Sequence, residues 1–320
     1  MALRNSLFAV SGKASFLDAR CDMSGLFVCD NTTMRPIAGI LDRSQDNLVT
    51  GSSSSMSVTV HPFNAVLNRY GALLLQNDGD VKVPLSAAPS ANSRIDVVYV
   101  KQNETRSPMS DSSDSPIFGV AKGVAAATPV APAVPGGALA LAQVRLPAGV
   151  SNTAAGGVVI TQTYIGAALK GDMLRVQTSA QRDALTHVPA GTLLHNVADN
   201  NDYLRTPSGK WAKTRDALSF KAPYSAVWWL SREWDTVIVS GSEHYQGSGQ
   251  QNHATAEVTM PVGWRPYGSS NTAFDYGVVS AVNANWCNFV RPDGHIVMLG
   301  DTEAKYSGVT GGWQCREWRA

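Results

Sequence analysis

Charged side chains are scarce in this chain of 320 residues. They make up 16% of it, against about 25% in an ordinary globular domain, and the formal net charge is +1. Ser, Thr, Asn, Gln and Gly must therefore cover much of the surface, which suits β proteins and permanent oligomers. Because the net charge is so small, no overall field draws the chain to nucleic acid or to an anionic membrane, and we expect neither as a partner.

Long apolar runs are also missing. No stretch of about 18 apolar residues occurs, which argues against a transmembrane helix. The first residues, MALRNSLFAVSGKASF, lack the unbroken apolar segment and the cleavage site of a signal peptide. We therefore expect a protein that is made in the cytoplasm, is not exported through a signal peptide and is not inserted into a membrane.

Cysteine is rare, and its spacing excludes two kinds of small domain. The four cysteines, Cys21, Cys29, Cys287 and Cys315, are too few for a disulfide scaffold and lack the CxxC spacing of a zinc site. We expect free structural thiols, with Cys287 and Cys315 as the pair more suited to a bridge if one forms.

The sequence motifs of common enzyme classes are missing as well. No GxSxG, GxxxxGKS/T or HExxH motif occurs, nor a GxGxxG before a predicted helix, so we expect no enzyme and no cofactor. Glu233 and Asp235 are the best candidates for a glycosidase pair, but they adjoin a turn instead of lining a cleft. Glu243, His244 and His253 could bind a zinc-like ion, although such a Gly/Gln-rich stretch is more often a solvated loop tip.

The first third of the chain predicts several β-strands. Residues 56–63 alternate apolar and polar side chains, residues 71–76 form a short buried run, and residues 94–100 are β-branched and aromatic. The sequence NDGD at residues 77–80 supplies a turn between two of these strands. Arg94 and Asp96 share one strand face, where we expect pairing across a sheet or a subunit joint.

Loop signals follow these strands. Residues 101–116 lose all periodicity and gain Ser, Asp and Pro, which predicts a flexible excursion from the sheet. Prolines then keep the chain extended up to residue 135, and Gly136-Gly137 turn it into a strand at residues 138–146. Residues 152–157 are a plausible hinge, so we place the first domain at residues 1–157.

Residues 158–213 predict a linker and a small neck module. Residues 178–185 have the cap and the helix formers of one short helix. Short strands on either side of residues 198–201, and a turn at residues 207–209, predict a small β-meander after it. Because a unit of this size is not very stable alone, we expect it to pack against a neighbour or around a symmetry axis.

Residues 214–320 predict an all-β head domain. Short apolar strands at regular spacing are separated by Gly, Pro and Asn, which is typical of a β-sandwich or a jelly roll. The sequence PDG at residues 292–294 predicts a hairpin, and PVGWRP at residues 261–266 predicts a strand exit and corner. There Arg265 could stack on Trp264 or pair with a carboxylate, although a purely structural corner is favoured. The whole chain is thus expected to be mainly β.

Several phrases in this order resemble minor tail or baseplate proteins of tailed phages, particularly those that infect actinobacteria. MSVTVHPFNAVL, SRIDVVYV and VPGGALALAQVRLPAG resemble the domain that attaches such proteins to the tail tip. GDMLRVQTSAQRDAL, followed by GTLLHNVADNNDYLRTPSGKW, resembles a module that recurs in tail fibres and spikes. VTMPVGWRPYG, followed by FVRPDGHIVML, resembles the head domains of receptor-binding proteins. The resemblance implies a homotrimer on the virion, contacts to other tail-tip proteins through the first domain, and binding to saccharides of the bacterial envelope.

Tryptophan is confined to the end of the chain. All eight tryptophans lie in the last 110 residues: Trp211, Trp228, Trp229, Trp234, Trp264, Trp286, Trp313 and Trp318. Some must be core, because the adjacent Trp228 and Trp229 point to opposite faces of a strand. Others suit saccharide binding, in which an indole stacks on a sugar ring while nearby polar groups bind its hydroxyls. We expect two or three exposed indoles.

The leading hypothesis is a non-enzymatic virion protein of the tail tip whose C-terminal domain binds a cell-envelope glycan. Its candidate ligand-binding residues are Trp234, Trp264, Arg265, Trp286, His244 and His253. Two alternatives stay open. One is a purely structural baseplate component that anchors another receptor-binding protein, and the other is a tail-spike enzyme that degrades glycans.

Overall fold

The computed structural model describes residues 14–41, 47–223, 227–243, 250–268, 277–281, 286–301 and 307–315. Strands make up 47% of the chain and helices 6%, so the predicted mainly β fold is confirmed. The chain divides into two compact units, Met1–Asn200 and Asn201–Ala320, and each is described by itself. The three segments expected from the sequence stay a prediction.

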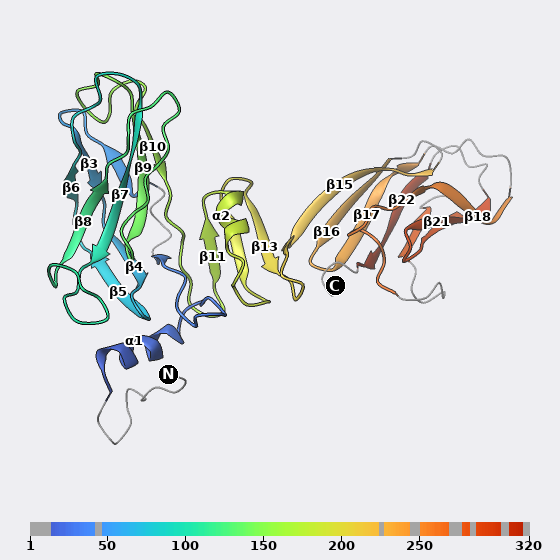
Figure 1. The fold of residues 1–320 in the computed structure, drawn as a ribbon. Helices are drawn as coiled ribbons and strands as arrows, with labels where there is room; N and C mark the ends of the chain where they lie inside the picture. The colour runs from blue at the N-terminus through green and yellow to red at the C-terminus, as the bar shows by residue number, and fades with distance from the viewer. Residues whose placement is uncertain are drawn as a thin grey trace. The chain divides into compact units, whose positions relative to one another are not determined.

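Three sheets share the main apolar core of the first unit (Figure 1). The strand orders are β1-β4-β5, β2-β3-β6 and β10-β9-β7-β8. Val58, Phe63 and Leu141 come from three different sheets and meet in this core. The strands are β1 (Gly39–Ile40), β2 (Val49–Gly51), β3 (Ser57–Val60), β4 (Phe63–Asn68), β5 (Ala72–Asn77), β6 (Val81–Pro84), β7 (Arg94–Gln102), β8 (Pro116–Ala121), β9 (Leu139–Leu146) and β10 (Val159–Gln162).

Residues 56–63, predicted as a single strand, contribute to two sheets. The chain leaves β3 and enters β4 at Pro62, which has no N–H to donate to a ladder. The turn predicted at residues 77–80 joins β5 to β6 and crosses between the same two sheets. The side-chain amide of Asn77 donates to the carbonyl of His61 over 3.0 Å, so the two crossings are tied together.

Arg94 and Asp96 pair with each other along β7 instead of across a sheet or a subunit joint. Both side chains are buried, and Arg94 Nε lies 2.9 Å from Asp96 Oδ1. Other guanidinium N–H groups donate to the carbonyls of Ser86 and Ala87, and Asp96 accepts the N–H of Gly123. The buried charges are thus satisfied, and the pair holds two loops against β7.

Helix α1 (Phe16–Ser24) was not predicted from the sequence. Ser15 and Asp18 form a capping box at its start, in which each backbone N–H donates to the side chain of the other residue, at 2.9 and 3.2 Å. At the other end, Ser24 Oγ accepts the N–H of Ala72, which ties the helix to β5.

The predicted hinge at residues 152–157 is wrong, because this loop is anchored in the first unit. The buried Thr153 hydroxyl accepts the N–H of Ser52 at 2.7 Å and donates to the carbonyl of Ser57 at 2.5 Å. The next strand, β10, pairs with β9 and so extends the first unit beyond the loop.

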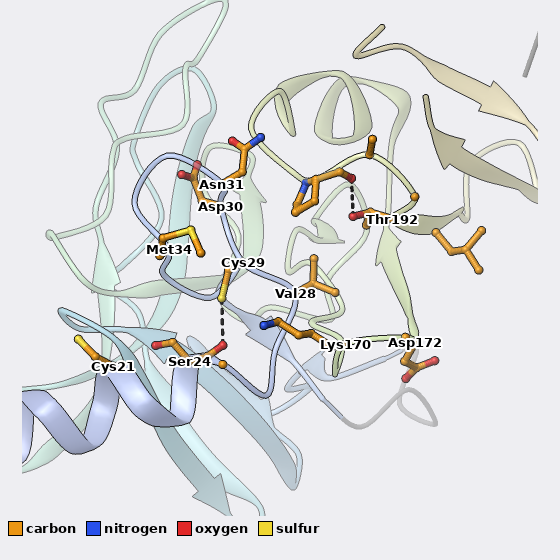
Figure 2. Close-up of a pocket in the computed structure, with 16 residues that line it drawn as sticks. Cys21, Ser24, Val28, Cys29, Asp30, Asn31, Met34, Lys170, Asp172 and Thr192 are labelled. Carbon is orange, nitrogen blue, oxygen red and sulfur yellow. Dashed lines mark hydrogen bonds between the residues drawn. The ribbon is translucent and has the colours of Figure 1, made fainter. Parts of the chain in front are cut away.

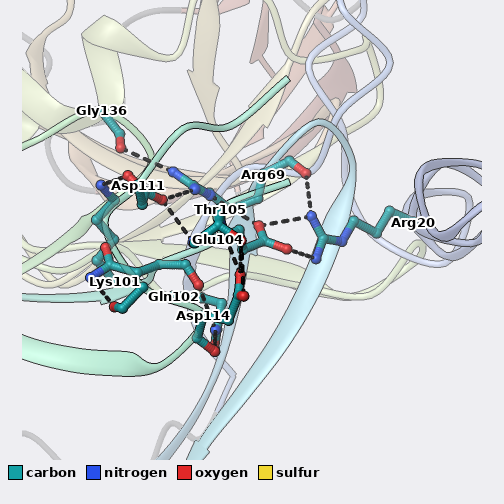
Figure 3. Close-up of polar contacts among 11 residues, drawn as sticks. Arg20, Arg69, Lys101, Gln102, Glu104, Thr105, Asp111, Asp114 and Gly136 are labelled. Atoms are coloured by element: carbon teal, nitrogen blue, oxygen red, sulfur yellow. Dashed lines mark hydrogen bonds and ion pairs between the residues drawn. The ribbon is translucent and has the colours of Figure 1, made fainter. Parts of the chain in front are cut away.

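The loop between β7 and β8 is tied down by ion pairs and is not the predicted flexible excursion (Figure 3). The carboxylate of Asp111 binds the guanidinium of Arg69 and, at 2.6 Å, the ammonium of Lys101. Glu104 pairs with both Arg69 and the α1 residue Arg20. The loop composition suggested mobility, but its acidic side chains find cations on neighbouring elements.

A parallel strand pair and a short helix complete the first unit. β11 (Met173–Val176) and β12 (Leu193–Asn196) are parallel, and α2 (Ser179–Ala184) lies in the connection between them. The predicted short helix is confirmed, with Thr178 as its N-cap. Two parallel strands that are neighbours in a sheet need a long crossover connection, because a two-residue turn can join only antiparallel strands.

The second unit begins with a hairpin of β13 (Asn201–Arg205) and β14 (Trp211–Lys213), around the turn predicted at residues 207–209. Eight further strands in its described part form one curled sheet (Figure 1), in the order β15-β16-β17-β22-β19-β20-β21-β18. These strands are β15 (Arg215–Lys221), β16 (Val227–Glu233), β17 (Thr236–Glu243), β18 (Gln250–Thr259), β19 (Gly277–Ala281), β20 (Trp286–Val290), β21 (His295–Asp301) and β22 (Ser307–Gln314).

One face of this sheet carries the core of the second unit. Trp228, Val279 and Ile296 are fully buried there and belong to one apolar cluster. The strands predicted for a sandwich or jelly roll therefore lie in one curled sheet, whose curvature lets it enclose its own core.

The predicted hairpin at residues 292–294 is confirmed between β20 and β21, where Gly294 has a φ of +92°.

Two further expectations concern the thiols and membrane insertion. All four cysteines are free in the structure, as predicted. Among the helices that the structure describes, none is both long and apolar enough to cross a membrane.

The loop network predicts a defined response to acid. The hydrogen bond from Lys101, together with those from Glu104 N–H and Arg69, lowers the pKa of Asp111 to about 2. An unfolded aspartate has a pKa of about 3.9, so this carboxylate stabilises the fold fully above about pH 5 and loses that effect as the pH falls towards 2. Asp111→Asn should lower the free energy of unfolding of the first unit by about 1.5–3 kcal/mol at pH 7 and flatten its decline below pH 4.

Denaturant unfolding between pH 7 and pH 2 measures both effects. Asp78→Asn, which changes an exposed aspartate of the same unit, is the matched control and should leave the curve unchanged. An Asp111→Asn variant with the acid dependence of the unmodified chain would contradict the assignment.

Candidate functional site

The second unit presents one face of its sheet away from the core. Along β15, β16 and β17, burial alternates strictly with residue number, so every second side chain faces outward. The same alternation continues on β22 and β19. We call this surface the outer face and define it by Ala217, Ser219, Trp229, Ser231, Ile238, Ser240, Val278, Ser280, Thr310 and Gly312; Ser280 is half-buried and the others are exposed.

Strand register places hydroxyl groups on both sides of Trp229. On the neighbouring strands Ser219 and Ser240 lie directly opposite it, and Thr310 follows Ser240 in the same row. The indole of Trp229 is 56% exposed, although a large apolar side chain in a monomeric domain is usually covered. An exposed ring among short hydroxyl side chains can stack on an apolar surface while its neighbours donate and accept hydrogen bonds.

None of the ten residues that define the outer face is charged, and the exposed charged residues on the same side of β15 and β16 lie at the ends of these strands. At one end of the face, Arg215 and Glu233 lie opposite each other and form an ion pair of 3.0 Å. At the other end of β15 lies the exposed Lys221. Five strands spaced at about 4.8 Å give the face a width of roughly 20 Å, which fits an extended neutral ligand.

The tryptophan pair on β16 behaves as the sequence predicts. Trp228 is fully buried in the core, and Trp229 lies on the outer face. Trp229 was nevertheless missing from the predicted ligand-binding residues. The alternation of β16 contains the signal, because Trp228 and Leu230 share a face and Trp229 must then point away from the core.

Trp234 is exposed, as predicted, and lies in the turn between β16 and β17. Its indole is 46% exposed, and its backbone has a φ of +57°. The backbone N–H of Trp234 donates to the carbonyl of Thr214 at 2.7 Å, which fixes the turn against the start of β15. Trp234 therefore adjoins the end of the outer face that carries the Arg215–Glu233 pair.

Trp264 was predicted to be exposed, and this prediction is wrong. Its indole is only 7% exposed and belongs to the core. After Pro261 the chain turns back, because the N–H of Trp264 donates to the Pro261 carbonyl and Gly263 has a φ of +91°. The carbonyl of Trp264 then accepts the indole N–H of Trp313 at 2.7 Å.

The cation that covers Trp264 is Arg232, not the predicted Arg265. The Arg232 guanidinium lies 5.2 Å from the Trp264 ring, and its Nη1 donates to the Gly263 carbonyl at 2.6 Å. Arg265 Nε instead donates to the carbonyl of Met260 at 2.8 Å. These contacts make residues 261–266 the structural corner that the sequence favoured.

The other predicted site residues cannot be placed by their side chains. Trp286 lies on β20 and His253 on β18, but their side chains are outside the described residues, as is all of His244. A ligand-binding role for these three residues stays a prediction. In the part of the chain that is described, no group of three or more His, Cys, Asp or Glu residues could hold a metal ion.

Comparisons with known proteins leave the chain without an assigned family. A scan against models of protein families gives no match, and a search among curated proteins gives none either.

Trp264 and Trp234 should differ in how much their truncation to alanine destabilises the fold. Trp264→Ala removes a buried core indole that the Arg232 guanidinium covers, and should cost about 3–5 kcal/mol in unfolding free energy. Trp234→Ala removes an exposed indole and should cost less than about 1 kcal/mol. Thermal unfolding of the two variants measures the contrast, and equal destabilisation would refute the different burial of the two rings.

Proposed function

We propose that this chain is a non-enzymatic structural protein of a phage tail tip, and that its second unit binds a glycan of the host cell envelope. The ordered phrases that resemble tail proteins support the virion assignment. Trimeric assembly through residues 158–213 and attachment through residues 1–157 belong to the same proposal. The observation that carries the binding function is the outer face, with Trp229 exposed among hydroxyl side chains.

The chemistry of the outer face suits a sugar better than a charged ligand. A pyranose has an apolar face of C–H groups, on which an indole can stack, and a rim of hydroxyls that need hydrogen-bond partners. Ser219 and Ser240 lie directly beside Trp229 and can serve those hydroxyls. Neutral ligands also avoid the desolvation penalty that a buried charge would impose at this uncharged surface.

A purely structural baseplate role remains the second candidate, because one observation favours it as well. A wide uncharged face with Trp229, Ile238 and Val278 exposed also suits contact with another protein subunit. The two functions differ in what covers Trp229 on the particle, which is sugar in one case and protein in the other.

The enzyme alternative receives less support from the geometry. Glu233 ends β16 and pairs with Arg215, whereas Asp235 lies in the following turn and its carbonyl accepts the N–H of Cys315. A glycosidase needs two carboxyl groups that flank a bound sugar across a cleft. Two residues at one end of a hairpin do not provide that arrangement.

Glycan binding by the outer face predicts a selective loss on truncation of Trp229. Trp229→Ala should weaken binding of the full chain to an envelope glycan about tenfold, which corresponds to about 1.4 kcal/mol. Val262→Ala, which truncates an exposed apolar side chain outside the outer face, is the matched control and should change nothing. A glycan array followed by titration of the bound glycans gives both values.

A folded chain that binds no glycan or envelope fraction would refute this function. Glu233→Gln separates binding from catalysis: it should leave glycan affinity within about twofold, because its ion pair is exposed. Release of reducing sugar from envelope material by the unmodified chain, abolished by Glu233→Gln, would establish the enzyme instead.

A further inference from the structure

Two pockets of the first unit differ in the charges that line them. The larger has a volume of about 510 Å³, lies beside the end of α1 and is lined by Asp30, Asp172 and Lys170 (Figure 2), so charges of both signs face a ligand there. The smaller has a volume of about 370 Å³ and lies between the turn after β4, the loop between β7 and β8, Arg35 and residues 136–137. Both volumes are typical of sites for small molecules.

The ion-pair network beside the smaller pocket has more cations than carboxylates. Arg69 and Asp111 line this pocket, and Asp111 is the only carboxylate among its described lining residues. Asp111 pairs with Arg69 and Lys101, and Glu104 pairs with Arg69 and Arg20 (Figure 3). Three cations thus neutralise two carboxylates, so the network leaves an excess of positive charge at the pocket.

Arg35 adds a cation that has no carboxylate partner among the described residues. Its guanidinium makes no hydrogen bond to them and lies 4.8 Å from the centre of the Tyr70 ring. The carboxylate of Asp30, five residues away, binds the amides of Thr32 and Thr33 instead. A guanidinium that stacks on a ring keeps its N–H edge free, and this edge binds a carboxylate or a phosphate through two parallel hydrogen bonds.

The backbone holds Arg35 and Tyr70 in place before any ligand binds. Tyr70 lies in the turn of residues 69–71 between β4 and β5, with a φ of +58° that is unfavourable for a bulky side chain. The carbonyl of Arg35 accepts the N–H of Asp30 at 2.9 Å, which closes the loop that carries Arg35. Backbone strain of this kind is common where a side chain is held ready for a ligand.

Uncharged polar groups complete the pocket. Asn68, Tyr70 and Ser110 line it, and their side chains make no hydrogen bond to another residue that the structure describes. They offer one amide and two hydroxyls, all of which can both donate and accept. Pro108 and Met109 add apolar surface. A ligand that matches all these groups combines an oxyanion, several hydroxyls and C–H groups.

We propose that this pocket binds a small hydroxylated acid, either a sugar acid or a sugar phosphate. Its oxyanion binds Arg35, and its hydroxyls bind Asn68, Tyr70 and Ser110. Inorganic phosphate would leave these three polar groups to water, whereas a neutral sugar would leave Arg35 without an anionic partner. The site lies in the first unit and goes beyond the proposed function, because it does not involve the outer face.

Four small molecules probe the site in the full chain: glucuronate, glucose 6-phosphate, glucose and inorganic phosphate. Binding is followed by NMR of chain methionines carrying ¹³C-labelled methyl groups, in which Met109→Leu identifies the Met109 signal among the eight methionines. The Met109 methyl should shift and saturate with at least one of the two acids, and the tighter acid identifies the oxyanion. Glucose and inorganic phosphate should each bind about tenfold more weakly than that acid, because each lacks one half of its contacts.

Arg35→Gln tests the role of charge and keeps a hydrogen-bonding side chain. It should abolish the preference for the acid over glucose. Arg145→Gln, which changes an exposed arginine on β9 of the same unit, is the matched control and should keep the preference.

Ser110→Ala tests the role of the hydroxyls. It should weaken binding of the acid about threefold and leave the weaker binding of inorganic phosphate unchanged. Circular dichroism and the melting temperature of the three variants report whether they fold like the unmodified chain.

Three results would overturn the proposal. The first is a Met109 methyl that neither acid shifts. The second is glucose that binds as tightly as the acids, or a preference for the acid that persists in folded Arg35→Gln. The third is inorganic phosphate that binds as tightly as either acid, which would make the pocket a site for an adventitious ion only.

Failure of this site is distinguishable from failure of the proposed function. The four small molecules report on Arg35 in the first unit, whereas the envelope-glycan measurements report on Trp229 in the second. A chain that binds an envelope glycan through Trp229 but neither acid would lose only the site at Arg35.

Discussion

A pleated strand sends successive side chains to opposite faces of its sheet, and the second unit depends on that constraint. On β16 it buries Trp228 and exposes Trp229, and on β17 it buries Val237 and Val239 while Ile238 points outward. Because alternate residues of a strand belong to different faces, the sequence can place large apolar residues on one face and small or polar residues on the other. Here the second face is composed of Ser, Thr, Gly and a few apolar side chains, and it is the surface to which we assign binding.

The distribution of charged residues differs between the parts of the structure. The outer face contains none of the charged residues, and the nearest ones form the Arg215–Glu233 pair at its end. In the first unit, by contrast, charges are concentrated in networks that hold loops, such as Asp111 with Lys101 and Arg69. Ion pairs thus fix loops of the first unit, whereas the ten residues that define the outer face of the second unit are neutral.

Local patterns in the sequence predicted most of the strands, the short helix α2 and the hairpin at residues 292–294. They predicted them because alternation, caps and turn residues act over a few positions. The capping box of Ser15 and Asp18 was an equally local signal, and α1 could have been predicted from it. The parallel pairing of β11 and β12 could not, because it depends on residues that are distant in sequence.

The errors in the candidate site have the same origin. Trp264 was expected on the surface because it lies in a Pro- and Gly-rich corner, but long-range contacts with Arg232 and Trp313 fold the corner into the core. The mobile loop and the hinge were expected from composition, and the partners that fix them, such as Lys101 and Ser57, lie outside those segments. The composition of a segment indicates how much conformational entropy it loses when it becomes ordered. Whether the segment is ordered depends on contacts with residues that are distant in sequence.

Hydroxyl-radical footprinting of the full chain, alone and bound to host envelope material, tests the central claim most directly. The account predicts rapid oxidation of Trp229 in the free chain and its protection in the bound chain, with Trp228 and Trp264 protected in both. Oxidation of Trp229 that is equally fast with and without bound envelope material would contradict a binding role for the outer face.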